Sequence, residues 1–139
     1  MKPDFIVFVS GGQRDIAVGE IKPPSNSTAT NCGESDQVKL GRMMKEMYND
    51  LVVRGVRNPV VGGILVEGEI MKTFIMKLEF ARIYELVELS KTPLFQSITF
   101  MTLLPTLVSD LMMLKVKLFW LYILRFILMV DYHAYVAYT

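Results

Sequence analysis

The pattern of apolar and polar positions divides the chain into an alternating first part, a helical stretch, further alternating runs and a strongly apolar end. Residues 5–9 and 16–21 are short apolar runs that flank the polar and glycine-containing residues 10–14. Glycine and polar residues between two apolar runs are typical of a hairpin connection. The pattern therefore predicts an antiparallel β-hairpin at the start of the chain.

A single apolar stripe marks the next element. The breaker-rich residues 23–34 predict a polar loop, after which Ser35 or Asp36 is placed to cap a helix that Gly55 ends. Within this helix, apolar residues recur at three- and four-residue intervals: Leu40, Met43, Met44, Met47, Tyr48 and Leu51. This spacing predicts an amphipathic helix that packs on a sheet.

The following runs complete the predicted fold. Residues 59–66, 70–78 and 83–89 have the composition of strands, with Tyr84 and Leu86 on the opposite face from Val87 and Leu89. Residues 97–114 have a helical pattern in which Pro105 marks a break or a helix start. We therefore expect an α/β (α+β) fold, in which a mixed β-sheet carries the amphipathic helix.

The C-terminal run differs in composition from the rest of the chain. Residues 116–130 are almost wholly apolar apart from Lys117 and Arg125. We expect a core over residues 1–90, a helical extension over 91–114, and a hydrophobic helical segment over 115–139 that is poorly integrated with the sheet.

Three interpretations of the segment 115–139 stay open: a tail anchor in a membrane, a core or interfacial helix, and a tail foreign to the preceding domain. A membrane span needs about 20 apolar residues, and the uncharged stretch 118–124 is shorter. Continuing the span through Arg125 costs about 2.5 to 3.5 kcal/mol near the bilayer centre. In the tail-anchor interpretation, Lys115 and Lys117 lie on the cytosolic side.

Composition and charge narrow the classes of function. The 139 residues allow one domain, and the net charge of +1 comes without the basic block that is typical of nucleic-acid binding. The single cysteine, Cys32, excludes an internal disulfide framework and a cysteine zinc site. His133 is the only histidine and has no companion at metal or triad spacing. Since the first strand follows the N-terminal methionine too closely for a signal peptide, we expect an intracellular protein.

The predicted hairpin brings candidate chemistry to one end of the sheet. A fold about Gly12 places Asp4 next to the Glu20-Ile21-Lys22 end of the second strand, and Glu20 and Lys22 share one face of that strand. The face of Asp4 depends on the hairpin register, which the sequence leaves open. If Asp4 shares that face, two carboxylates and an ammonium converge as an oxygen-ligand site for Mg²⁺. The structural alternative is a solvated strand face.

These residues carry a resemblance to a known family. Pro3-Asp4, then Glu20-Ile21-Lys22 after a hairpin, then an amphipathic helix, resembles the PD-(D/E)xK nuclease superfamily, which has the restriction-endonuclease-like fold. The resemblance implies that Asp4, Glu20 and the Ile21 carbonyl are ligands of Mg²⁺, and that Lys22 orients or activates the attacking water. It also implies hydrolysis of phosphodiester bonds in nucleic acid, with the metal polarising the phosphoryl oxygen.

The chain departs from the pattern of this family in two places. Gln37 is placed to face the carboxylates, as a glutamine does in some relatives, but Gly41 stands where those relatives have an aromatic residue. The helix and strand that precede the hairpin in the family are missing, so we expect a truncated or degenerate member.

Three functions stay open after this comparison. The first is a Mg²⁺-dependent nuclease with Asp4, Glu20, Lys22 and Gln37 in its site. The second is a catalytically silent binding or scaffolding domain of the same fold, and the third is a small membrane-associated protein anchored by its C-terminal run.

Overall fold

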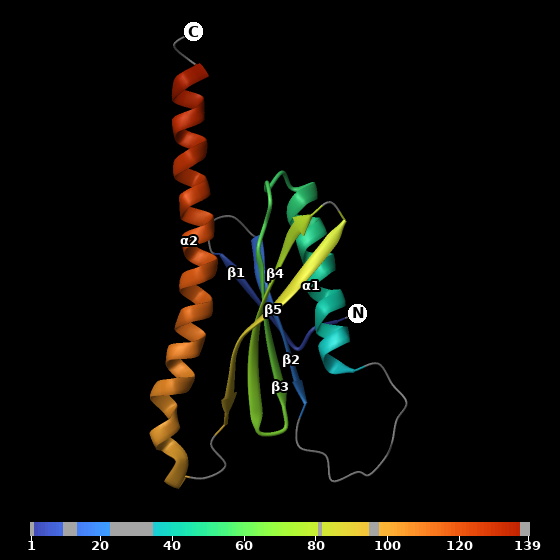
Figure 1. The fold of residues 1–139 in the computed structure, drawn as a ribbon, viewed down its shortest axis with the longest axis vertical. Helices are drawn as coiled ribbons and strands as arrows, with labels where there is room; N and C mark the ends of the chain where they lie inside the picture. The colour runs from blue at the N-terminus through green and yellow to red at the C-terminus, as the bar shows by residue number, and fades with distance from the viewer. Residues whose placement is uncertain (1, 10–13, 23–34, 81, 95–97, 137–139) are drawn as a thin grey trace.

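The computed structural model describes residues 2–9, 14–22, 35–80, 82–94 and 98–136, which form a five-stranded mixed sheet and two long helices (Figure 1). The elements follow in the order β1 (Phe5–Val9), β2 (Arg14–Lys22), α1 (Asp36–Val53), β3 (Val61–Glu67), β4 (Ile70–Phe80), β5 (Ile83–Pro93), the 3₁₀ helix η1 (Ile98–Leu103) and α2 (Leu104–Val136). The predicted α+β class is confirmed. Cys32 and the polar loop predicted at 23–34 lie outside the described residues.

The sheet has the strand order β1-β2-β3-β4-β5. The strands β2 and β3 pair in parallel, and every other neighbouring pair is antiparallel. A parallel pair needs a crossover connection, and α1 provides it between β2 and β3. The hairpin, α1 and the parallel β3 therefore form one continuous unit of the chain.

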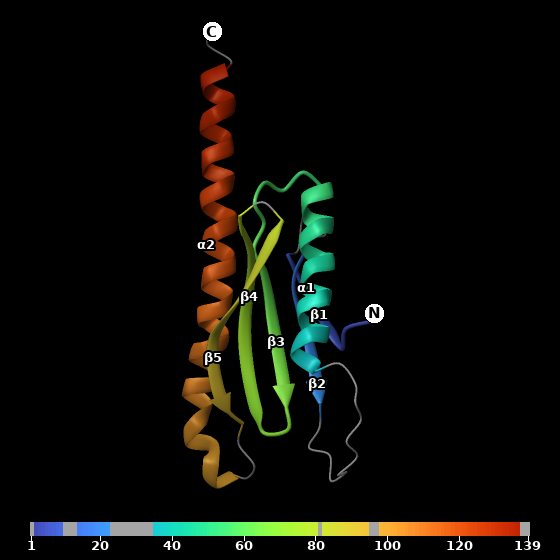
Figure 2. The same ribbon diagram turned by 45° about the vertical axis from the view of Figure 1, so that its right-hand side comes forward.

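The two long helices cover opposite faces of the sheet, which gives three layers (Figure 2). The face under α1 holds the larger core cluster, which consists of Val18, Leu40, Met43, Met44, Tyr48, Leu51, Val61, Leu65, Phe74 and Met76. The face under α2 holds a smaller one, which consists of Ala17, Val60, Leu114 and Leu118. Successive residues of β2 alternate between these clusters, since Ala17 belongs to one and Val18 to the other.

The helix α1 has the ends that its sequence predicts. Ser35 is the N-cap, and its hydroxyl accepts a hydrogen bond of 3.4 Å from the backbone N–H of Val38. Gly55 follows the helix with φ of 84°, a left-handed conformation that glycine adopts without steric cost. The predicted apolar stripe faces the sheet, and its members Leu40 and Met44 are fully buried.

The strand β5 is longer than predicted, but the predicted faces of Tyr84, Leu86 and Leu89 are confirmed. Tyr84 and Leu86 pack on the α1 side of the sheet, whereas Leu89 packs on the α2 side. The strand extends to Pro93 because it pairs with β4 along its full length, as far as the pair Ile70 and Pro93.

The boundary expected at residue 115 falls inside the helix α2, and the first part of the expected C-terminal segment packs on the sheet. The helix α2 runs without a break from Leu104 to Val136, and Leu118 is only 3% exposed. Leu118 is buried because Gly62 leaves room for it: a Cβ at Gly62 would lie 2.8 Å from Leu118 Cδ1. Thr92 of β5 also donates a hydrogen bond to Asp110 of α2. The start of α2 is therefore part of the core.

The sequence predicts that Pro105 marks either a break in a helix or the start of one. It marks a start, since it is the second residue of α2. Within the part of the chain that the structure describes, no helix combines the length and the apolar character that crossing a membrane requires.

Candidate functional site

The candidate site lies where the start of β1 meets the end of β2. The two strands pair from Phe5 with Gly19 to Val7 with Ala17, and the register then shifts so that Phe8 pairs with Asp15. The shift leaves Ile16 as the extra residue of a bulge. This bulge fixes the register between the start of β1 and the end of β2. The sequence alone left that register open.

Asp4 contacts the end of β2 through its backbone and its side chain. Its backbone N–H donates a hydrogen bond of 3.1 Å to the carbonyl of Gly19. Its carboxylate oxygen Oδ2 accepts a hydrogen bond of 2.7 Å from the backbone N–H of Ile21. The structure thus places Asp4 beside the Glu20-Ile21-Lys22 triplet.

Glu20 occupies the buried side of the site. It is only 4% exposed, and its oxygen Oε1 accepts a hydrogen bond from the ammonium of Lys39 on α1. Its other oxygen, Oε2, is buried and has no hydrogen-bond partner among the described residues. A buried carboxylate oxygen without a partner is costly, so this atom marks a place where a ligand would be stabilised.

Lys22 lies on the same side of the sheet as Glu20, because both side chains contact α1. Its ammonium forms an ion pair with Asp36 in the first turn of α1, and its side chain is 55% exposed. The site therefore has a buried end at Glu20 and a solvent-exposed end at Lys22 and Asp4.

Lys39 is a residue of the candidate site that sequence reasoning missed, since it contacts Glu20 directly. Its pKa is raised above the ordinary value of 10.5, chiefly by its hydrogen bond to Glu20. Attraction to Glu20, Asp4 and Asp36 adds to the increase in pKa, while partial desolvation opposes it. Three carboxylates therefore act on one ammonium. The signal in the sequence is that Lys39 directly precedes the apolar stripe at Leu40, at the edge of the helix face that meets the sheet.

The other two predicted site residues have different surroundings. Gln37 is exposed in the first turn of α1, and no hydrogen bond among the described residues joins it to Asp4 or Glu20. Lys39, two positions later, is the α1 residue that reaches Glu20. Ile21 lies between Glu20 and Lys22 and pairs with Val66 of β3, so its carbonyl belongs to the same strand end.

The donor set at this strand end suits a hard divalent cation. Mg²⁺ is commonly held by one or two carboxylates, with water and substrate phosphates completing its coordination. Asp4 and Glu20 provide two carboxylates, and Glu20 Oε2 is an available oxygen. Among the described residues, no group of three or more histidine, cysteine, aspartate and glutamate side chains is arranged for a metal ion. A Mg²⁺ site at this strand end would therefore have two carboxylates, those of Asp4 and Glu20.

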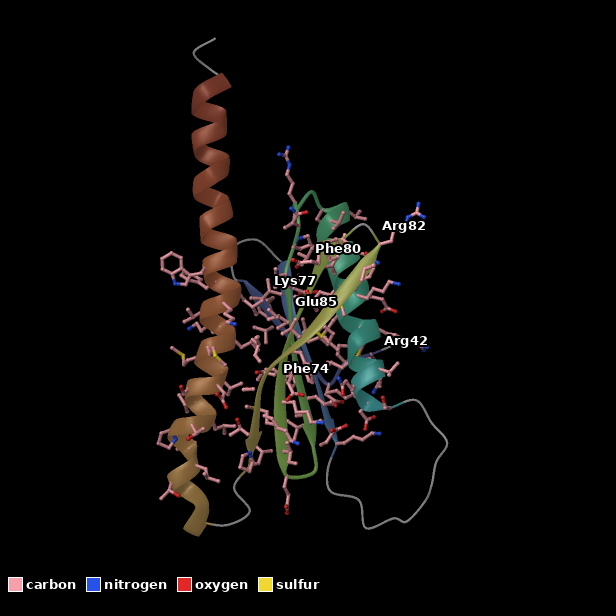
Figure 3. The ribbon with its side chains drawn as sticks, viewed as in Figure 1. Arg42, Phe74, Lys77, Phe80, Arg82 and Glu85 are labelled. Carbon is pink, nitrogen blue, oxygen red and sulfur yellow. The ribbon has the colours of Figure 1, made fainter. Side chains whose placement is uncertain are left out.

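The next basic residue of α1 after Lys39 is directed away from these carboxylates. Arg42 follows Lys39 by one turn of α1 and points away from the sheet (Figure 3). The ammonium of Lys22 lies beside the first turn of the same helix, because it forms an ion pair with Asp36.

Comparisons of this chain with protein-family models, with curated proteins and with solved structures found no match.

Proposed function

We propose that this chain is a PD-(D/E)xK nuclease-like domain with a restriction-endonuclease-like core, and that it hydrolyses phosphodiester bonds of nucleic acid with Mg²⁺. The observation that carries the proposal is the oxygen Oε2 of Glu20. This carboxylate oxygen is buried, has no hydrogen-bond partner among the described residues, and belongs to the residue that precedes Ile21, the partner of Asp4. The order of hairpin, crossover helix and parallel strand supports the same proposal.

Each residue of the site has a separate task in this proposal. Asp4, Glu20 and the Ile21 carbonyl would hold Mg²⁺, which supplies a Lewis acid for the phosphoryl group when it is bound. The hydrogen bond from the Ile21 N–H keeps the Asp4 carboxylate at the strand end. Asp36 holds the Lys22 ammonium nearby, where it orients the attacking water and stabilises charge that develops on the phosphate.

A catalytically silent binding or scaffolding domain is the second candidate function. Two observations favour it: Lys39 is already bound to Glu20, and Lys22 is already bound to Asp36. An ammonium that is neutralised by a carboxylate contributes less to binding or catalysis on a phosphate. In the silent domain, these ion pairs hold α1 on β2 and have no other task.

Two substitutions separate these functions. Glu20→Gln removes a charged ligand with little change of shape, so it should weaken Mg²⁺ binding and cleavage together. Lys22→Ala should leave Mg²⁺ binding intact and slow cleavage by roughly 10² or more, as expected for the loss of one electrostatic stabiliser. Lys77→Ala, on the distant strand β4, is the matched control and should change neither property.

The measurements are calorimetric titration with Mg²⁺ and cleavage assays on single- and double-stranded DNA and RNA with Mg²⁺ or Mn²⁺. Cleavage that Lys22→Ala abolishes would establish the nuclease. The silent domain predicts no cleavage of any of these substrates and no heat of Mg²⁺ binding that depends on Glu20.

A further inference from the structure

Glu20 is only half satisfied by its protein contacts. Burial of an ionised carboxylate is costly unless both oxygens have partners, and here Lys39 is bound to Oε1 alone. The oxygen Oε2 has no hydrogen-bond partner among the described residues. The site can therefore accept more positive charge or a better-placed cation than the single ammonium provides.

Lys39 has the freedom to leave Glu20. Its side chain is 29% exposed although Glu20 is nearly fully buried, so the stem leads from the interior to the surface of α1. A lysine side chain can keep its apolar stem in place while its ammonium moves into water. Glu20 lies near the end of β2, which pairs with β1 on one side and β3 on the other, and its buried side chain has no comparable freedom.

The electrostatic surroundings favour one cation at this place. Glu20, Asp4 and Asp36 all act on the Lys39 ammonium. A divalent cation held by Asp4 and Glu20 would be close to the ammonium, and two cations at one carboxylate repel each other. The simplest arrangement is that only one of them occupies Glu20 at a time.

We propose that the Lys39 ammonium and a divalent cation compete for the Glu20 carboxylate, so that the ammonium must leave Glu20 before the metal binds there. This inference rests on the proposed function, since it concerns the same metal site. Competition lowers the affinity of the site for the metal by the free energy needed to break the Lys39–Glu20 pair. Lys39 therefore determines the concentration of divalent cation at which the domain changes from the ion-paired form to the metal-bound form.

Calorimetric titration of the full chain with Mg²⁺, and separately with Mn²⁺, tests this competition. Lys39→Met should bind the metal about tenfold more tightly than the natural sequence, or more, within the usual range of coupling between sites. Lys22→Met is the matched control. It also removes one positive charge near the site, but this charge is paired with Asp36 and not with Glu20. An affinity gain for Lys39→Met that does not exceed that of Lys22→Met would overturn the proposal.

Lys39→Gln is a second test variant, for use if Lys39→Met does not fold. Glutamine can still donate a hydrogen bond to Glu20 but carries no charge, so it should also bind Mg²⁺ more tightly than the natural sequence.

A second readout uses unfolding by urea and does not depend on cleavage. With a chelator present, Lys39→Met should unfold at lower urea than the natural sequence, because Glu20 is left buried and unpaired. Saturating Mg²⁺ should then raise the urea midpoint more for Lys39→Met than for the natural sequence, since tighter binding stabilises the folded state more. Equal increases in the two proteins would contradict competition.

Failure of this inference is distinguishable from failure of the proposed function. Cleavage with unchanged metal affinity in Lys39→Met overturns the competition and leaves the nuclease intact. Tighter metal binding by Lys39→Met without any cleavage supports the competition and removes the nuclease. Absence of Glu20-dependent binding in the natural sequence, Lys39→Met and Lys39→Gln overturns both.

Discussion

Asp4 and Ile21 are joined by a hydrogen bond of 2.7 Å from the Ile21 backbone N–H to the Asp4 carboxylate, across 17 positions of the chain. The bond connects the start of β1 to the end of β2. It also fixes the Asp4 carboxylate next to Glu20 in the strand that carries the candidate site. One side chain therefore serves the stability of the hairpin and the geometry of the site.

Replacing Asp4 should separate these two contributions. Asp4→Ala removes the acceptor and should lower the free energy of unfolding by about 1 to 2 kcal/mol, as expected for a hydrogen bond with a charged partner near the surface. Asp4→Asn keeps an acceptor oxygen and should lose less stability, but it should bind Mg²⁺ more weakly. Urea unfolding followed by circular dichroism, with calorimetry for the metal, measures both effects. Glu46→Ala, at an exposed position of α1, is the control, and equal losses in Asp4→Ala and Asp4→Asn would contradict this account.

Leu118 should contribute to folding although it lies in the apolar C-terminal run. Leu118→Ala removes a buried side chain from the cluster with Ala17 and Val60 and should cost about 2 to 5 kcal/mol of unfolding free energy. Val116→Ala, on the exposed side of the same helix, should cost about 0.5 kcal/mol or less. Urea unfolding compares the two variants. Equal small losses would mean that α2 does not pack on the sheet in solution.

Replacing two glycines with alanine, one at a time, should change the stability of the fold in opposite directions. At Gly62 an added Cβ would lie 2.9 Å from the Cβ of Ala17, an atom that can move only with the backbone of β2. Gly62→Ala should therefore destabilise the fold by about 1 to 3 kcal/mol. At Gly41 in α1 the nearest atom would be Leu86 Cδ2 at 3.8 Å, so Gly41→Ala should stabilise the helix by about 0.5 to 1 kcal/mol. Thermal unfolding gives both signs, and a stabilising Gly62→Ala would show that β2 and β3 are further apart.

Lys77 should make the stability of the β4–β5 hairpin depend on alkaline pH. Its pKa is raised above 10.5, first by the hydrogen bond to Glu79 and then by that to Glu85, at 2.5 Å and 3.1 Å. Lys77 and Glu85 lie side by side on neighbouring strands (Figure 3). Because the pKa is higher in the folded state, this contribution to stability is fully present below pH 10.5 and is lost as the pH rises through the raised pKa. Titration of the Lys77 side-chain resonances by NMR should give a higher midpoint than in the double variant Glu79→Gln and Glu85→Gln. The same midpoint in both proteins would mean that the two glutamates do not hold the ammonium.

The sequence by itself determined the elements whose signals are local. The apolar stripe, the cap at Ser35 and the stop at Gly55 predict α1, because helix periodicity and capping involve residues only a few positions apart. The same holds for the hairpin, and for Glu20 and Lys22 on one face of a strand, since side chains alternate with a period of two. The candidate carboxylates could therefore be named before the structure was known.

Only the tertiary structure decided how these residues meet. The bulge at Ile16 sets the register of β1 on β2, and a shift of one residue would move Asp4 along the strand and away from its present partner at Ile21. Lys39 reaches Glu20, and Leu118 becomes core, because α1 and α2 pack on opposite faces of the sheet. These contacts join residues far apart in the chain, so their energies depend on packing and desolvation, which no local pattern contains.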